Sequence, residues 1–410
     1  MIVFFSNKVL VFLLAFFSPM IINIGGEVSP SFLFIGLTFP LWHKYLPYRN
    51  DENYRYILRL FKAILCVQIL WIPFSDTLLM DQVKGILVVV SGMIFFMFYY
   101  MVYLYNKDVV KWAAFGTFLA SFVFIDVLVE MEGSDFGMWK FQIMPRLVSL
   151  CAVIYLWISN NKKLLKISPF LFIGVGVLGL ATGARSTGLT PFLAGTLTLF
   201  LQSKRHIKVW QIKKYIIYLL ISCYSLYAIV YVPNVLNGNI SSGNSEQLRA
   251  VENPYNPINL LMFGRVTSIV PFIAFFDRPL TGWGYMAEDP NGKYVKLAYK
   301  IQDADDIGVL NASSKSVIPR HSGWGDLSCS YGIIAFLAIF LMLMRCFKLL
   351  FESFVVCDKY LLYRIYISFS FLWNLLFSPL AHFKYSPMSL AIIIVFSVTA
   401  LNNQNKGNAL

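Results

Sequence analysis

The chain has 410 residues, of which 58% are hydrophobic and only 13% are charged. A soluble protein of this length needs far more charged surface, so the composition excludes a soluble globular protein. The formal net charge of +13 does not indicate a nucleic-acid partner, because the Lys and Arg residues are spread along the segments between apolar runs, where they orient a membrane protein.

Long apolar runs recur along the whole chain. A run such as GILVVVSGMIFFMFYYMVYLY (85–105) is long enough to cross a bilayer core of roughly 30 Å as a helix. Irregular backbone cannot face lipid, so repeated runs of this kind indicate a helical bundle. We predict an all-α integral membrane protein with about twelve transmembrane helices, near residues 9–24, 30–43, 57–74, 84–105, 110–129, 144–159, 167–182, 187–202, 214–231, 330–350, 360–378 and 385–401.

The segments between these runs alternate in charge. Those at 44–55, 107–111, 162–166, 204–214 and 345–359 each carry two or more basic residues, and the short segments that alternate with them carry few. Because basic loops are retained in the cytoplasm, both termini are predicted to be cytoplasmic. We therefore divide the chain into helices 1–9 (residues 1–231), one large periplasmic loop between helices 9 and 10 (232–328), and helices 10–12 (329–410).

The large loop contains an apolar piece at 257–276 with Arg265 near its middle. A thirteenth span there would bury that arginine and would move the basic residues Arg345 and Lys348 outside. We therefore expect this piece to lie as a helix at the membrane face.

Three residues on the predicted outer side border apolar elements and can do chemistry: Arg185 in ATGARSTG, Arg265 in MFGRVTSIV and His321 in RHSGWGD. The forked donors of arginine suit phosphate oxygens, so Arg185 and Arg265 could hold a lipid-linked diphosphate. The alternative is that each arginine snorkels toward water or lipid phosphates. An imidazole exchanges a proton near neutral pH, but His321 could equally be a polar loop residue. The helix after His321 is expected to begin between residues 326 and 330.

Other kinds of site are less well supported. The acidic run DADD (303–306) is typical of a solvated turn, and the chain has no Walker loop, nucleophile elbow or H-E-x-x-H motif. Two glycines in TGWGYMAED (281–289) fit either a ligand-facing turn or loop geometry alone. We expect no metal and no cofactor.

The order of TGARSTG, GRVTSIVPFIAFFDRPLTGWGY and RHSGWGDLSCSYGIIAFL resembles the O-antigen ligase and polymerase superfamily. Its members carry a G-R segment before a P-x-x-G-x-G turn, and then a histidine motif that opens a helix. The resemblance covers about residues 180–345, and the twelve-helix layout agrees with it. It implies a glycosyltransferase of the bacterial inner membrane whose donor is a glycan on undecaprenyl diphosphate and whose active site is periplasmic.

By this resemblance Arg185 and Arg265 would hold the diphosphate, and His321 would address the acceptor hydroxyl or reacting centre. Arg320, beside His321, is a further candidate for binding the substrate. Ser322 follows the histidine where asparagine is commoner, which leaves the acceptor open. A polymerase, slightly favoured, extends another lipid-linked glycan, with a chain-length regulator as an expected partner, whereas a ligase uses the lipid A–core. The non-enzymatic alternative is a flippase for the same lipid, which should show sequence repeats or charged residues inside the bundle.

Overall fold

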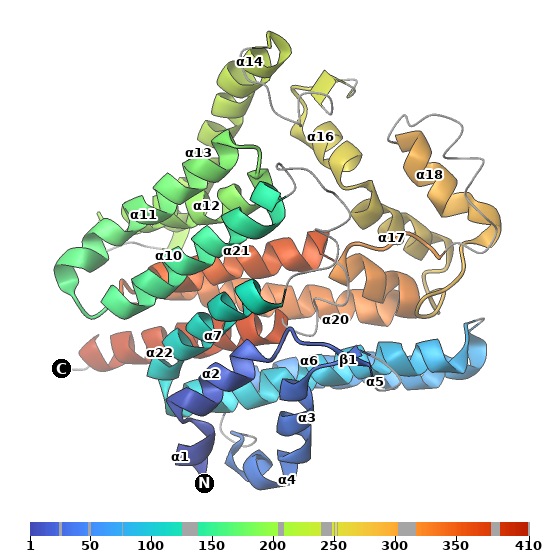
Figure 1. The fold of residues 1–410 in the computed structure, drawn as a ribbon, viewed down its shortest axis with the longest axis horizontal. Coiled ribbons are helices and arrows are strands. Elements are labelled where there is room, and N and C mark those ends of the chain that lie inside the picture. The colour runs from blue at the N-terminus through green and yellow to red at the C-terminus, as the bar shows by residue number, and fades with distance from the viewer. Residues whose placement is uncertain are drawn as a thin grey trace.

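Helices make up almost all of the computed structural model of the protein (Figure 1). It describes residues 1–410 apart from 24–26, 48–50, 76, 125–137, 204–208, 239–247, 250, 252, 302–316, 379–385, 409 and 410. Within the described residues the only strands are β1 (Ile22–Asn23) and β2 (Glu27–Val28), which form one short antiparallel pair. The all-α fold class predicted from the sequence is confirmed.

Each of the twelve predicted apolar segments contains a helix. In chain order these are α2 (Lys8–Phe16), α3 (Pro30–Leu37) with α4 (Phe39–Trp42), α5 (Glu52–Trp71), α6 (Leu79–Tyr105), α7 (Val110–Val123), α10 (Met144–Ile158), α11 (Lys162–Ala181), α12 (Arg185–Gln202), α13 (Val209–Leu226), α20 (Gly323–Ser353), α21 (Leu361–Phe377) and α22 (Ser386–Asn408).

Helix length limits which of these helices can cross a membrane. Among the described residues six helices are long and apolar enough, or seven if one bent pair counts as a span. By contrast α2 has nine residues and α3 has eight, so at about 1.5 Å per residue each covers less than half of a bilayer core. The structure therefore supports a multi-pass membrane protein, and twelve crossings stay a prediction.

Helix α6 forms the centre of the bundle. About 72% of its most apolar stretch is buried, and it packs against α5, α3 and α22, while α20 packs on α5 and α22 (Figure 1). At the other extreme, the continuous helix Trp210–Leu236, which comprises α13, η5 (Tyr227–Tyr231) and α14 (Val232–Leu236), is only 11% buried. This helix stands at the edge of the molecule with its apolar side chains outward, as expected for a lipid-facing helix.

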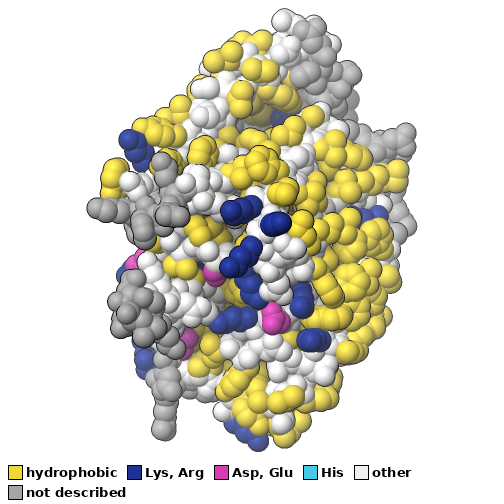
Figure 2. All heavy atoms as spheres, turned by 90° about the vertical axis from the view of Figure 1, so that its left-hand side faces the viewer, with side chains coloured by type: hydrophobic (Ala, Val, Ile, Leu, Met, Phe, Trp, Pro, Cys, Tyr) yellow, Lys and Arg dark blue, Asp and Glu magenta, His cyan; other side chains and the backbone are white. Residues whose placement is uncertain are grey.

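The two ends of the bundle differ in the kind of residues they carry. The connections from α6 to α7, from α10 to α11 and from α20 to α21 lie on the left in Figure 1, and the α5–α6 connection lies on the right with α17 (Val266–Asp277) and α18 (Lys293–Ile301). Viewed from the left, this end shows Lys and Arg side chains gathered across its middle, with few Asp or Glu (Figure 2). Three of the segments that the charge pattern assigned to the cytoplasm, at 107–111, 162–166 and 345–359, thus lie at the same end (Figure 1).

The predicted loop 232–328 contains folded structure and has different boundaries. Its start lies inside the helix that runs on to Leu236, and its end lies inside α20. The apolar piece at 257–276 forms two helices, α16 (Pro257–Gly264) and α17, bent by 88°, where one helix was expected. Helix α17 packs on α20 and α18. Its residues Val270 and Ala274 form a second, smaller core together with Tyr294 of α18.

Candidate functional site

Arg185 is the first residue of α12, directly after the tight turn that joins α11 to α12. The turn contains Gly183 at φ +83°, and glycines bring the two helices into backbone contact: a Cβ on Gly179 would lie 2.8 Å from the Cα of Gly188. Small residues allow such close packing of helices in membranes. The helix dipole does not stabilise a cation at a helix N-terminus. The close packing of α11 and α12 therefore holds Arg185 at a position where the helix N-terminus favours a bound anion.

An apolar cavity of about 550 Å³ lies beside Arg185, between α11, α12, the α13–η5 helix and α21. Arg185 and Ser186 are polar, and nearly all of the other lining residues are apolar. Val177, Leu226 and Val230 on its walls are each about half exposed, at 49%, 57% and 50%. The cavity therefore opens on the apolar side of the bundle, where lipid chains would lie.

Two aromatic rings that line this cavity each lie beside an arginine guanidinium. Tyr231 and Trp373 both line it, and the Cζ of Arg185 lies 5.5 Å from the centre of the Tyr231 ring. The Cζ of Arg265 lies 5.7 Å from the centre of the Trp373 ring. These are cation–π distances, and Trp373 consequently connects the second arginine to the cavity of the first.

Arg265 lies at the bend between α16 and α17, where it ends one helix and precedes the other with φ −136° and ψ 32°. Because the two helices diverge by 88°, the side chain leaves the chain at a corner. Neither Arg265 nor His321 lines the cavity itself. The structure thus places Arg185 in the cavity wall and Arg265 next to it through Trp373.

His321 is held by its backbone between α17 and α21. The hydroxyl of Ser268, one turn after Arg265, donates to the His321 carbonyl at 2.8 Å. The next residue, Ser322, is fully buried, and its hydroxyl donates to the carbonyl of Leu375 at 3.5 Å. Since Leu375 is two residues beyond Trp373 on α21, three of the four predicted site residues, Arg185, Arg265 and His321, lie near the end of that helix.

The imidazole of His321 is exposed and its orientation fixes one tautomer. Its Nδ1 lies 2.9 Å from the carbonyl oxygen of Arg320. A carbonyl oxygen can only accept, so Nδ1 carries the hydrogen and, in the neutral ring, Nε2 is the acceptor. This arrangement leaves Nε2 free to take a proton from a ligand.

Helix α20 begins at Gly323, earlier than the expected start between residues 326 and 330. Ser322 is its N-cap, because the Ser322 hydroxyl accepts the backbone N–H of Gly325 at 3.0 Å. Serine is among the best N-cap residues, so the segment S-G-W-G-D contained a serine that indicates a helix start at Gly323. His321 is consequently the residue just before the cap, and the cap fixes its backbone.

The guanidinium of Arg320 has hydrogen-bond partners within the protein. Its Nη1 donates to the Ser330 hydroxyl at 2.6 Å, and its Nη2 donates to the Gly284 carbonyl at 3.1 Å. It therefore ties the 279–284 turn to α20. Within the described residues its buried Nε has no hydrogen-bond partner, and the substrate-binding role predicted for Arg320 stays a prediction.

The glycines of the TGWGY turn are explained by packing. The backbone N–H of Gly284 donates to the Ser330 carbonyl at 3.0 Å, and a Cβ on Gly282, which has φ +70°, would lie 2.5 Å from the Ser330 backbone. Gly332 breaks α20 at φ +72° opposite Leu280. Of the two interpretations of this turn, close docking onto α20 is the one its contacts support.

The aromatic side chains of the large loop also have internal partners. The Trp283 indole N–H donates to the Ala274 carbonyl at 2.7 Å, and its ring packs edge-on against Tyr294. Trp324 packs against Phe272 and Phe336. These rings build the core around α17. The aromatic rings beside the two arginines are those of Tyr231 and Trp373, which the motifs did not contain.

Comparison with known proteins adds no assignment to this geometry: no family model matches the chain, and no curated protein matches it either.

Proposed function

We propose that the protein is an inner-membrane glycosyltransferase that takes a glycan from undecaprenyl diphosphate and transfers it to a sugar hydroxyl. The observation that carries the proposal is the apolar cavity with Arg185 in its wall and Trp373 linking it to Arg265. A lipid-linked diphosphate needs an apolar surface for its isoprenoid chain and cations for its headgroup. The cavity offers both, and the sequence resemblance to O-antigen ligases and polymerases supports the same reading.

The two arginines would act on the charge that develops during transfer. As the bond from the anomeric carbon to the phosphate oxygen breaks, negative charge grows on the diphosphate leaving group. Guanidinium groups already in place stabilise that charge without reorganisation, and their forked donors match phosphate oxygens. Arg185 and Arg265 are thus the diphosphate ligands of the proposal.

His321 would activate the acceptor. Its Nε2 accepts the proton of the acceptor hydroxyl while the hydroxyl oxygen forms the new bond to the anomeric carbon and undecaprenyl diphosphate departs. The hydrogen bond from Nδ1 to the Arg320 carbonyl keeps the ring in the tautomer required for this step. Direct displacement of this kind inverts the anomeric configuration.

The proposal includes an orientation in the membrane. We place the termini in the cytoplasm and the active site in the periplasm from the charge pattern, with the twelve crossings predicted from the apolar runs. The gathering of Lys and Arg at the end opposite α17 and α18 supports that orientation (Figures 1 and 2). Between the two acceptor classes we retain the slight preference for a polymerase over a ligase.

Transfer by purified full-length protein reconstituted with an undecaprenyl-diphosphate-linked glycan tests the proposal. Arg185→Ala and Arg265→Ala should each lose at least about tenfold in transfer rate, since a hydrogen bond to a charged group contributes about 1.5–3 kcal/mol. The Lys variants should recover only part, because an ammonium lacks the fork. Arg278→Ala is the control, an exposed arginine near the end of α17. Normal transfer by both alanine variants would overturn the diphosphate role and leave two snorkelling arginines.

The acceptor class has a separate test in cells that lack the protein. A surface glycan of one repeat on the lipid A–core indicates a lost polymerase. Free lipid-linked polymer with a bare core indicates a lost ligase. Loss of the surface glycan with lipid-linked glycan retained on the cytoplasmic side would instead identify a flippase.

A further inference from the structure

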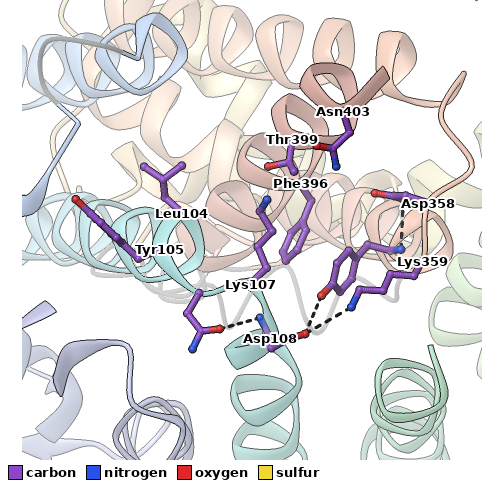
Figure 3. Close-up of a pocket in the computed structure, with 11 residues that line it drawn as sticks. Leu104, Tyr105, Lys107, Asp108, Asp358, Lys359, Phe396, Thr399 and Asn403 are labelled. Atoms are coloured by element: carbon purple, nitrogen blue, oxygen red, sulfur yellow. Dashed lines mark hydrogen bonds and ion pairs between the residues drawn. The ribbon is translucent and has the colours of Figure 1, made fainter. Parts of the chain in front are cut away.

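A second cavity lies at the opposite, basic end of the bundle and has no part in the proposed transfer. It has a volume of about 420 Å³ and is enclosed by the end of α6, the 3₁₀ turn η3 (Lys107–Val109), the chain between α20 and α21, and α22 (Figure 3). Tyr360 and Phe396 form its aromatic wall, with ring centres 4.6 Å apart. Leu104 and Tyr105 at its edge are 40% and 54% exposed, so the cavity meets the apolar side of the bundle as well as the basic face.

Both carboxylates in this cavity already have cationic partners. Asp108 accepts from the Tyr360 hydroxyl at 3.2 Å and lies 3.6 Å from the Lys359 ammonium. Asp358 pairs with Arg364 at 3.2 Å. Arg364 is fully buried and also donates to backbone carbonyls of neighbouring segments, so this pair belongs to the core of the bundle.

Lys107 is the cation that remains. Within the described residues its ammonium has no ion pair or hydrogen bond, and Figure 3 shows the amine pointing toward Phe396 and Thr399, away from Asp108. Burial lowers its pKa, and Asp358 opposes this from a distance. A half-buried ammonium is costly without an anion beside it. The amide of Asn403, also without a hydrogen bond in the described part of the chain, lines the same cavity and can donate to that anion.

The surroundings favour negatively charged ligands. Lys162, Lys163 and Lys166 are exposed at the start of α11 on this end, and Lys348 is exposed near the end of α20. Figure 2 shows the resulting basic face. A surface of one sign raises the local concentration of ions of the other sign, and juxtamembrane basic residues attract acidic lipid headgroups.

We propose that this cavity binds a phosphate group, with Lys107 as its charged ligand and Asn403 as a neutral donor. The group can belong to the headgroup of an acidic phospholipid, whose acyl chains would run along Leu104 and Tyr105, or to a free phosphate compound. Occupation would link α6, α22 and the α20–α21 connection at one point. The inference rests on the fold and on the charges of this cavity, independently of the glycosyl transfer proposed above.

Two binding measurements on full-length protein in neutral detergent test it. One measures the thermal unfolding midpoint as inorganic phosphate is added, with sodium chloride at the same ionic strength as the control. The other counts retained phosphatidylglycerol against phosphatidylcholine by native mass spectrometry. Lys107→Gln should weaken the phosphate or lipid affinity at least about tenfold, and Lys107→Arg should restore most of it. Lys163→Gln is the control, an exposed lysine of the same face that does not line the cavity.

The two probes distinguish the possible sources of the phosphate group. A response to inorganic phosphate alone identifies a free phosphate compound, and retention of phosphatidylglycerol alone identifies a lipid headgroup. The proposal is overturned if neither probe binds the wild type saturably, or if Lys107→Gln and Lys163→Gln weaken binding equally, which would indicate general attraction to the face. If Lys107→Gln does not fold, Asn403→Ala replaces it, and unchanged binding by that variant would also overturn the site.

Discussion

At the scale of single residues, the charged residues of the candidate site could be selected from the sequence, but the residues that contact and position them could not. Arg185, Arg265 and His321 could be chosen because each interrupts or borders an apolar run. Ser268 and Trp373 could not, because their roles depend on contacts with residues far away in the chain. Arg320 was assigned to the substrate from its position beside His321, and only the folded contacts reveal that it serves the 279–284 turn.

His321→Ala should lose about 10²–10⁴-fold in transfer rate, the usual contribution of a positioned general base, with little change in donor binding. The measurement is single-turnover transfer from saturating lipid-linked donor. His43→Ala is the control, because the ring of His43 stacks on Phe39 among the N-terminal helices and its Nδ1 lies 3.1 Å from the Phe39 carbonyl oxygen, as the Nδ1 of His321 lies near a carbonyl. A folded His321→Ala protein that transfers at the wild-type rate would make this histidine a loop residue. We also expect His382→Ala to be nearly silent, although residue 382 lies outside the described residues.

Trp373→Leu should separate donor binding from chemistry. The change removes the ring beside Arg265 but keeps an apolar wall for the cavity, so we expect a donor KM raised about 2- to 30-fold, the range of a cation–π contact, and a nearly unchanged kcat. Trp157→Leu is the matched control, since Trp157 holds Lys111 in the same way at the basic end. Equal effects of the two substitutions would indicate a loss of folding.

At the scale of helices and turns, apolar runs predicted where helices occur but predicted their lengths less well. Residues 9–24 and 30–43 were predicted to be two spans, yet the first contains a helix of nine residues and the second contains helices of eight and four residues. Hydropathy reports burial, and a short helix packed on neighbours is as apolar as one in lipid. The bend at Arg265 and the break at Gly332 could not be predicted from the sequence either, because each depends on the element that packs against it.

Gly332→Ala should destabilise the protein by at least about 2 kcal/mol, because alanine is strained at φ +72° and its Cβ would collide with the Leu280 backbone. Thermal unfolding in detergent measures this as a lower midpoint. Gly174→Ala, in α11 with nothing near its Cβ, should be neutral or slightly stabilising. An unchanged midpoint for Gly332→Ala would show that α20 does not need its break.

At the scale of the whole molecule, basic segments that charge grouped together lie at one end of the bundle (Figure 2), while the side on which that end lies and the number of crossings stay predictions. The basic segments gather at one end (Figure 2), while the candidate site residues border the end of α21 through contacts from α12, α17 and the start of α20. The positive-inside bias depends only on short-range sequence, whereas a count of crossings depends on how short helices pack.

Cysteine labelling of intact cells tests the orientation. Single cysteines are placed in a chain whose own six cysteines are replaced, since Cys66 and Cys357 are exposed and would react. Lys300→Cys on α18, together with Asn244→Cys and Asp305→Cys outside the described residues, should react with a membrane-impermeant maleimide. Lys163→Cys at the basic end should react only after the cells are permeabilised. The reverse pattern would place Arg185, Arg265 and His321 on the cytoplasmic side, where a periplasmic transfer could not occur, and it would leave the fold and the phosphate cavity unchanged.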